Sequence, residues 1–167
     1  LPVQWVNRPN LDFRGFSGTV ASGTIKPGDE IIVTASGQTS TVKDIVTFDG
    51  NLDVAIAGQA VTLTLADEID ISRGDVLAQA DAKPEFADQF EARIIWMHDD
   101  HLLPGRPYLI KMGAQVTNAQ ISDLKYKVNV NTLEHMAGKT LELNEVGIAN
   151  ISADKALAFD PYDDNRH

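Results

Sequence analysis

The sequence predicts an all-β protein built from two small β-barrels in tandem. Apolar and polar residues alternate over many short runs, glycine-containing turns separate these runs, and only one short segment of the 167 residues has a helical pattern. Many short strands joined by glycine turns are typical of barrels and sandwiches. The proline-containing stretch Ala82–Glu85 interrupts the strands, so we expect one barrel over residues 1–83 and a second over residues 84–167.

The first barrel is expected to consist of short strands with tight turns between them. Its clearest strand is the segment 58–65, where valine and leucine alternate with threonine and therefore share one face. Gly15 and Gly18 lie inside another strand pattern, which predicts a bulge or a close approach of two backbones there. The expected strands are residues 3–7, 13–23, 30–34, 39–48 and 58–65.

The second barrel is expected to contain strands at residues 89–97, 108–112, 114–127 and 140–151. One short helix is predicted at 131–137, because Asn131 is a suitable N-cap, Glu134 follows three residues later and Gly138 is a suitable stop. The polar tail 160–167 is expected to fray.

Charge and composition exclude several classes of function. The chain has 14 basic and 24 acidic residues, a formal net charge of -10, and both predicted barrels are acidic. Such a field repels phosphate backbones and anionic lipids, so neither nucleic acid nor a membrane is an expected partner. The absence of cysteine excludes disulfides, thiolate metal sites and a cysteine nucleophile. No signal peptide or membrane-spanning run is present, and we expect a cytoplasmic protein.

Three spaced blocks in the first barrel resemble the second domain of translation-factor GTPases such as elongation factor Tu. The first block combines an arginine, a G-x-V-x-x-G-x-I core and a closing Gly-Asp turn, and the later blocks resemble the A-G-x-x-V strand and the I-x-R-G-x-V-L element of that domain. The blocks are Arg14–Asp29, Ala57–Val61 and Ile71–Leu77. Val20 and Ile25 are placed to fill a barrel, and Gly23 and Gly28 permit tight corners.

Further blocks resemble one branch of that superfamily, the large subunit of bacterial sulfate adenylyltransferase, and specifically its domains II and III. These blocks run through both predicted barrels, so the resemblance covers essentially the whole chain. They are Leu1–Asn10, Val46–Gly50, Thr64–Gly74, Leu103–Arg106, Asn131–His135, Leu143–Gly147 and Ala158–Tyr162.

This resemblance implies a part of an enzyme complex. In the family, an N-terminal GTPase domain that uses GTP and Mg drives a small subunit, which joins ATP and sulfate into adenosine 5′-phosphosulfate and pyrophosphate. The barrels are therefore expected to be non-catalytic and inactive alone, to need no cofactor themselves, and to support the GTPase domain and the docking of the small subunit. Some members carry a fused adenylylsulfate kinase domain, and the chain itself does not reveal whether its parent does.

Four residues are candidate contacts within such a complex: Arg14, Arg73, Leu103 and Arg106. Arg14 and Arg73 each lie beside a glycine of the barrel signature. A structural role, in which the guanidinium fork ties turns together, is favoured over contact with the GTPase domain. Leu103 and Arg106 flank a Pro-Gly turn.

The sequence offers no catalytic or cofactor-binding residue. Gly138-Lys139-Thr140 has the end of a phosphate-binding loop, but the first glycine would have to stand at Leu133. Asp12–Gly15 fits the D-x-x-G pattern of GTPases by letters alone, and no serine lies in a nucleophile motif. The cluster His98–His101 has metal-ligand residue types, but adjacent residues on a loop diverge, so a polar loop is favoured and no metal is expected.

Two other functions compete with this interpretation. A translation-factor fragment that grips aminoacyl-tRNA shares the barrel signature, but the acidic charge and the form of the second barrel oppose it. A general protein-interaction module unrelated to GTPases does not account for the three spaced barrel blocks.

Overall fold

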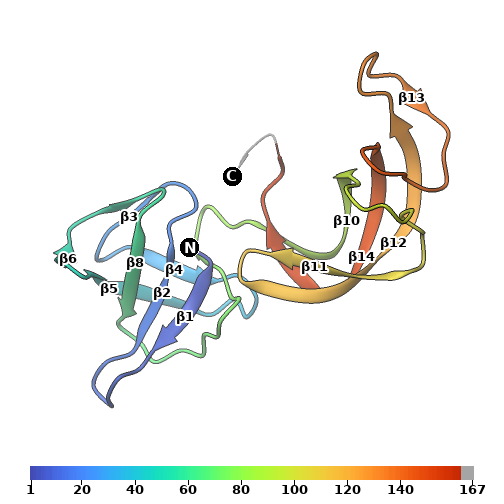
Figure 1. Ribbon diagram of the computed structural model, residues 1–167. Coiled ribbons are helices and arrows are strands. Elements are labelled where there is room, and N and C mark those ends of the chain that lie inside the picture. The colour runs from blue at the N-terminus through green and yellow to red at the C-terminus, as the bar shows by residue number, and fades with distance from the viewer. Residues whose placement is uncertain (163–167) are drawn as a thin grey trace. The chain divides into compact units, whose positions relative to one another are not determined.

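The computed structural model describes residues 1–162, and these form strands, turns and loops without a helix, which confirms the predicted all-β class (Figure 1). Contacts divide the chain into two units. The first comprises Leu1–Phe86 together with Met112–Gln115 and the residues from Ala158 on, and the second comprises Ala87–Lys111 and Val116–Leu157. Of the polar tail predicted to fray, residues 163–167 lie outside the described residues.

The first unit contains an antiparallel seven-stranded sheet of order β1-β2-β8-β5-β4-β9, in which β6 also pairs with β5; a small second sheet joins β3 to β7. The strands are β1 (Val3–Asn7), β2 (Gly15–Thr19), β3 (Thr24–Ile25), β4 (Glu30–Val33), β5 (Thr39–Thr47), β6 (Gly50–Leu52), β7 (Ala55–Ile56), β8 (Ala60–Leu65) and β9 (Leu77–Gln79).

Backbone hydrogen bonds between the two ends of this sheet close it into a barrel. Pro2 forms an antiparallel bridge with Val76, and the Leu77 N–H donates to the Leu1 carbonyl over 2.9 Å. The Val3 N–H donates to the Asp75 carbonyl over 2.8 Å. Closure removes free edges and gathers the inward side chains into one core. That core includes Val3, Phe16, Ile31, Val42, Ile45, Leu63 and Leu77, each at most 2% exposed.

The predicted close backbone approach is found at Gly18. The pairing of β1 with β2 shifts register between Val3 and Trp5, directly beside Gly18. A Cβ atom on Gly18 would lie 2.2 Å from the Pro2 carbonyl oxygen, so a larger residue would push the first strand off the sheet.

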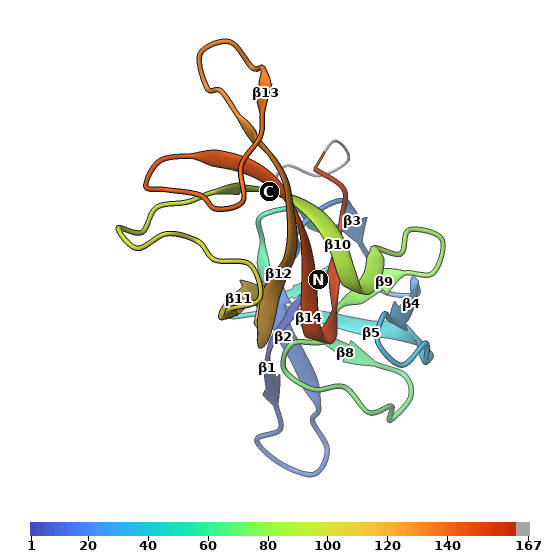
Figure 2. The same cartoon turned by 90° about the vertical axis from the view of Figure 1, so that its right-hand side faces the viewer.

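The second unit is built on a strongly curved sheet of order β10-β14-β12-β11, with β13 paired to the end of β12 (Figures 1 and 2). The strands are β10 (Glu85–Ile95), β11 (Pro107–Met112), β12 (Gln115–Val128), β13 (His135–Met136) and β14 (Val146–Phe159). Two register shifts between β12 and β14 allow these long strands to bend. Apart from Thr117 and alanines, the buried side chains are larger aliphatic ones: Leu102, Ile121, Leu124, Leu141, Ile148, Ile151 and Leu157.

The predicted helix at 131–137 is wrong. The Asn129 side chain, not that of Asn131, caps this segment, because its Oδ1 accepts hydrogen bonds from the Asn131 and Thr132 N–H groups. His135 then pairs with Val128 in β13. A backbone that can complete ladder hydrogen bonds with an adjacent strand gains more than one isolated helical turn would provide.

The strand predicted at 140–151 begins later, at Val146. Residues 142–145 form a turn in which the Glu145 N–H donates to the Glu142 carbonyl, and Asn144 has a φ of 65°. Asparagine adopts this left-handed conformation at little cost, so residues 142–145 can form a turn. The strand therefore begins only after this turn, at Val146.

Replacing Leu63 with alanine is expected to destabilise the first unit by about 2–4 kcal/mol, because Leu63 is fully buried on β8 at the centre of the barrel. Urea unfolding followed by tryptophan fluorescence measures this. Leu11→Ala, at an exposed leucine, is the matched control and should change the free energy of unfolding by less than about 0.5 kcal/mol.

Among the described residues, β10 and β11 are the outer strands of the second sheet. Unpaired edges promote association. The chain 1–167 is therefore expected to show a mass above that of the monomer by light scattering at high concentration. Leu109→Lys, which places a charge at an exposed position of β11, should lower that mass. A monomer at every concentration would contradict the expectation.

Candidate functional site

Arg14 lies immediately before β2 and is largely covered, with a quarter of its side chain exposed. Its guanidinium carbon lies 5.5 Å from the centre of the Phe16 ring. Its Nη2 is 3.8 Å from Asp70 Oδ1, which is too long for a hydrogen bond, and the Asp70 side chain is almost fully exposed. Arg14 thus packs on an aromatic ring and forms one long ion pair, instead of the bidentate fork that the structural hypothesis describes.

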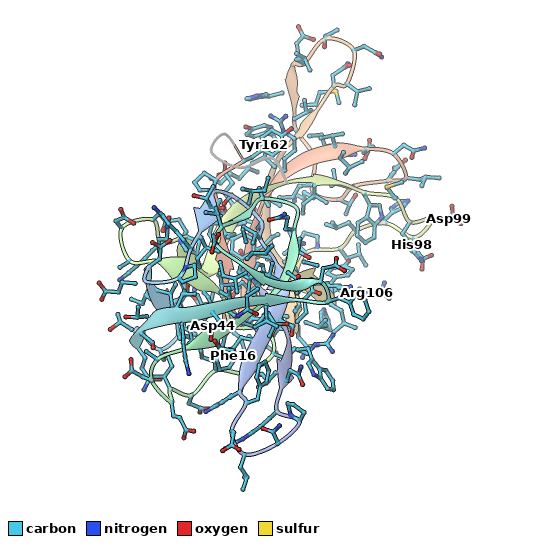
Figure 3. The ribbon with its side chains drawn as sticks, turned by 90° about the vertical axis from the view of Figure 1, so that its left-hand side faces the viewer. Phe16, Asp44, His98, Asp99, Arg106 and Tyr162 are labelled. Carbon is cyan, nitrogen blue, oxygen red and sulfur yellow. The ribbon has the colours of Figure 1, made fainter. Side chains whose placement is uncertain are left out.

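An open cleft of about 370 Å³ adjoins Arg14 in the first unit. Phe16 and Asp44, both labelled in Figure 3, line this cleft, and the Thr64 hydroxyl donates to Asp44 Oδ2 over 3.2 Å. Lys43 and Asp67 also line the cleft. It presents charged groups of both signs beside aromatic rings, which suits contact with polar groups of a partner.

Arg73 occupies a tight turn whose backbone is fixed on both sides. The Ser72 N–H donates to Asp75 Oδ2 over 2.7 Å, and the Gly74 N–H donates to the Val3 carbonyl over 2.9 Å. Arg73 itself is exposed, and its guanidinium forms no ion pair within residues 1–162. The turn that closes the barrel therefore holds a cation outward, toward solvent.

Leu103 and Arg106 belong to one ordered turn of the second unit. The Arg106 N–H donates to the Leu103 carbonyl, and the Leu103 N–H donates to the Tyr108 hydroxyl over 2.8 Å. Tyr108 packs edge-on against Trp96, with ring centres 5.6 Å apart. The structure thus places the four predicted residues in two groups, Arg14 and Arg73 in the first unit and Leu103 and Arg106 in the second.

The loop His98–His101 is held by its own hydrogen bonds. The Asp100 N–H donates to His98 Nδ1 over 3.0 Å, and the Trp96 indole donates to the Asp100 carbonyl over 2.7 Å. His98 and Asp99 point outward at the end of the loop (Figure 3). Within the described part of the chain, no three potential ligands gather as a metal site would require.

The segment Gly138-Lys139-Thr140 does not have the geometry of a phosphate-binding loop. It follows β13 and precedes a turn, whereas such a loop joins a strand to a helix N-terminus. A Cβ on Gly138 would collide with the stem of Lys127, which covers this glycine. None of the described residues belongs to a helix that could span a membrane.

Sequence reasoning missed the carboxylate of Glu145. This group accepts hydrogen bonds from the Glu142 N–H over 2.7 Å and from the Lys127 ammonium over 2.5 Å. The Glu142 N–H and then Lys127 lower the pKa of Glu145 below its ordinary value. The E-x-x-E spacing at 142–145 was the available signal for this turn.

Sequence reasoning also missed the loop of residues 129–136, called the tip loop below. The predicted helix 131–137 overlaps most of this loop, which instead exposes Val130, Leu133 and Met136. Leu133 has a φ of 60°, which no sequence pattern indicates for a leucine.

Two protein families match the chain in succession. Residues 16–78 match "Elongation factor Tu domain 2", and residues 89–167 match "GTP-eEF1A C-terminal domain-like". Together these two matches cover most of both predicted barrels, so the chain is similar to the barrel modules of elongation factors.

Curated relatives are more specific. The chain is 56% identical over 99% of its length to "Bifunctional enzyme NodQ" of Rhizobium sp., covering 26% of that protein. It is 52% identical over 99% of its length to "Sulfate adenylyltransferase subunit 1" of Aliarcobacter butzleri, covering 35%. It is 53% identical to "Bifunctional enzyme CysN/CysC" of Xylella fastidiosa, covering 27%. The chain thus spans about a quarter to a third of these relatives, and its predicted resemblance to the sulfate adenylyltransferase large-subunit family is confirmed.

Solved structures confirm the fold at low sequence identity. A structure of sup35 complexed with GDP matches 99% of this chain and 41% of its own, with a TM-score of 0.87 and 18% identity. The apo form of translation elongation factor SelB from Methanococcus maripaludis matches 95% of this chain and 36% of its own, with a TM-score of 0.74 and 22% identity.

Glu145→Gln is expected to lower the free energy of unfolding by about 1 kcal/mol at pH 7, because it removes a charge-assisted hydrogen bond to Lys127. The folded-state pKa of Glu145 is depressed, so its contribution is present above the ordinary carboxyl pKa and is lost as the pH falls through the folded value. Thermal unfolding over a series of pH values from 7 downward should show a difference that is largest at pH 7 and shrinks as the pH falls. Glu30→Gln, at an exposed carboxylate of β4, should show none.

Proposed function

We propose that the two units are the non-catalytic barrel part of the large subunit of a GTP-driven sulfate adenylyltransferase. In this role they support a GTPase domain and dock the small subunit, and the complex forms adenosine 5′-phosphosulfate and pyrophosphate from ATP and sulfate in the cytoplasm. The observation that carries the proposal is the roughly 50% identity, over 99% of this chain, to proteins named sulfate adenylyltransferase subunit 1.

The geometry supports a binding role over a chemical one. The segment closest to a phosphate loop lacks the required strand-to-helix junction, so GTP and Mg are assigned to the GTPase domain. The described residues offer rigid turns at Arg73 and at Leu103–Arg106, and the side chains of these turns are exposed. Arg73 and Arg106 are suited to pair with carboxylates on a partner.

A reconstitution experiment tests which part of the large subunit binds GTP and drives the reaction. The chain 1–167, the full-length large subunit and the purified small subunit are assayed for adenosine 5′-phosphosulfate with ATP, sulfate and GTP. We expect GTP-dependent product only with the full-length large subunit, and no GTP binding by the chain 1–167 in calorimetry. GTP binding by the chain 1–167 would sink the proposal. Salt-dependent binding of aminoacyl-tRNA to it would favour the translation-factor alternative.

Arg73→Ala and Arg106→Ala in the full-length large subunit are expected to weaken small-subunit binding several-fold, with a larger effect at low salt, because each removes an exposed charge from an ordered turn. Calorimetric titration over a range of salt concentrations measures this. Lys155→Ala, at an exposed cation on β14, is the control. Equal affinities for all three variants and the wild type would remove these turns from the interface.

A further inference from the structure

The tip loop (residues 129–136) projects beyond the curved sheet of the second unit at the end of β12, as both Figure 1 and Figure 2 show. Three apolar side chains within these eight residues contact solvent: Val130 is 61% exposed, Leu133 73% and Met136 40%. Single exposed apolar residues are ordinary, but three in one short projecting segment mark an interaction surface.

Hydrogen bonds hold the tip loop in one conformation without help from a partner. The Leu133 N–H donates to the Asn129 carbonyl over 2.7 Å, and the Asn129 N–H donates to the Glu134 carbonyl over 2.9 Å. The Thr132 hydroxyl donates to Glu134 Oε2 over 3.0 Å. Because the loop is already ordered, binding through it costs little conformational entropy.

The base of the loop is equally fixed. Lys127 and Val128 of β12 pair with Met136 and His135 of β13, and the His135 ring stacks on Tyr126 with centres 3.8 Å apart. The apolar side chains are therefore presented from a rigid support, as at the centre of a protein–protein interface.

Leu133 adopts a left-handed backbone conformation, with a φ of 60°. This conformation is unfavourable for a leucine and easy for asparagine or glycine. An exposed leucine in this conformation buries little apolar surface within the chain, so most of its side chain is available to a partner.

The charge of the loop indicates the kind of partner. Between Val128 and Gly138 the chain has Glu134 and His135 but neither lysine nor arginine. An apolar tip with one carboxylate fits a cleft with an apolar floor and a basic rim. The tip loop of a second copy would bring a like carboxylate against Glu134, so it does not provide this rim.

We propose that the tip loop inserts into an apolar cleft with a basic rim on the small subunit of sulfate adenylyltransferase. This inference rests on the proposed function and deepens it, because it names the surface that docks the small subunit.

The test uses the full-length large subunit and the purified small subunit, titrated by calorimetry. Leu133→Asn and Val130→Thr are each expected to weaken binding about tenfold or more. Val116→Thr is the matched control: it is the same substitution at a similarly exposed valine, 57% exposed at the other end of β12, and should change affinity less than about twofold. Leu133→Asn should leave the melting temperature unchanged or raise it, because asparagine relieves the strain.

Unchanged affinity of both tip variants, with normal binding by the wild type, would overturn this inference and leave the proposed function standing. Absence of binding by the wild type would overturn both. If the tip variants change only the mass of the large subunit in light scattering, the loop contacts a second copy. If Leu133→Asn only lowers its melting temperature, the loop packs within the chain. Either result would also overturn the inference.

Discussion

The two outer strands of the first unit's sheet find hydrogen-bonding partners in each other's ends, and the architecture of this unit follows from that pairing. Its seven-stranded sheet begins at β1 and ends at β9, and the backbone of Leu1–Val3 joins these two edges by bonding to residues 74–77. Closure forces the inward side chains into one aliphatic core around Phe16 and Leu63. It also fixes the turn that carries Arg73, because the adjacent Gly74 N–H and Asp75 carbonyl take part in the closing bonds. The candidate contact residue is thus held by the bonds that close the barrel.

Strand pairing shapes the second unit in another way. Its long strands β12 and β14 pair along most of their length with two register shifts, and the loops at their ends are fixed by local hydrogen bonds. Tyr108 holds the turn of Leu103, and Asn129 holds the tip loop. Loops fixed in this way can present side chains at defined positions although they are exposed, which is what a docking surface requires.

The acidic charge and the rigid turns together support a role in assembly. A net charge of -10 does not attract nucleic acid, and the turns present isolated arginines and leucines instead of a catalytic cluster. The relatives that match over the whole length of this chain are three to four times longer, so the two units correspond to a part of each relative. We therefore propose assembly and support of other domains as the role of these units.

The sequence by itself determined the all-β class, most strand positions and the family resemblance, because alternation, glycine turns and spaced signature blocks are local patterns. It also placed Arg73 on a turn and Leu103–Arg106 beside a Pro-Gly turn. Only the tertiary structure decided the backbone conformation of residues 129–136. The sequence of this segment has the capping pattern of a helix. There, pairing of His135 with Val128 and stacking on Tyr126 replace the helix, and Leu133 is left exposed with a positive φ. The packing of Arg14 on Phe16 and the depressed pKa of Glu145 were likewise decided by neighbours that only folding brings together. Contacts between segments distant along the chain carry no local signature, and these contacts set the geometry of the candidate site.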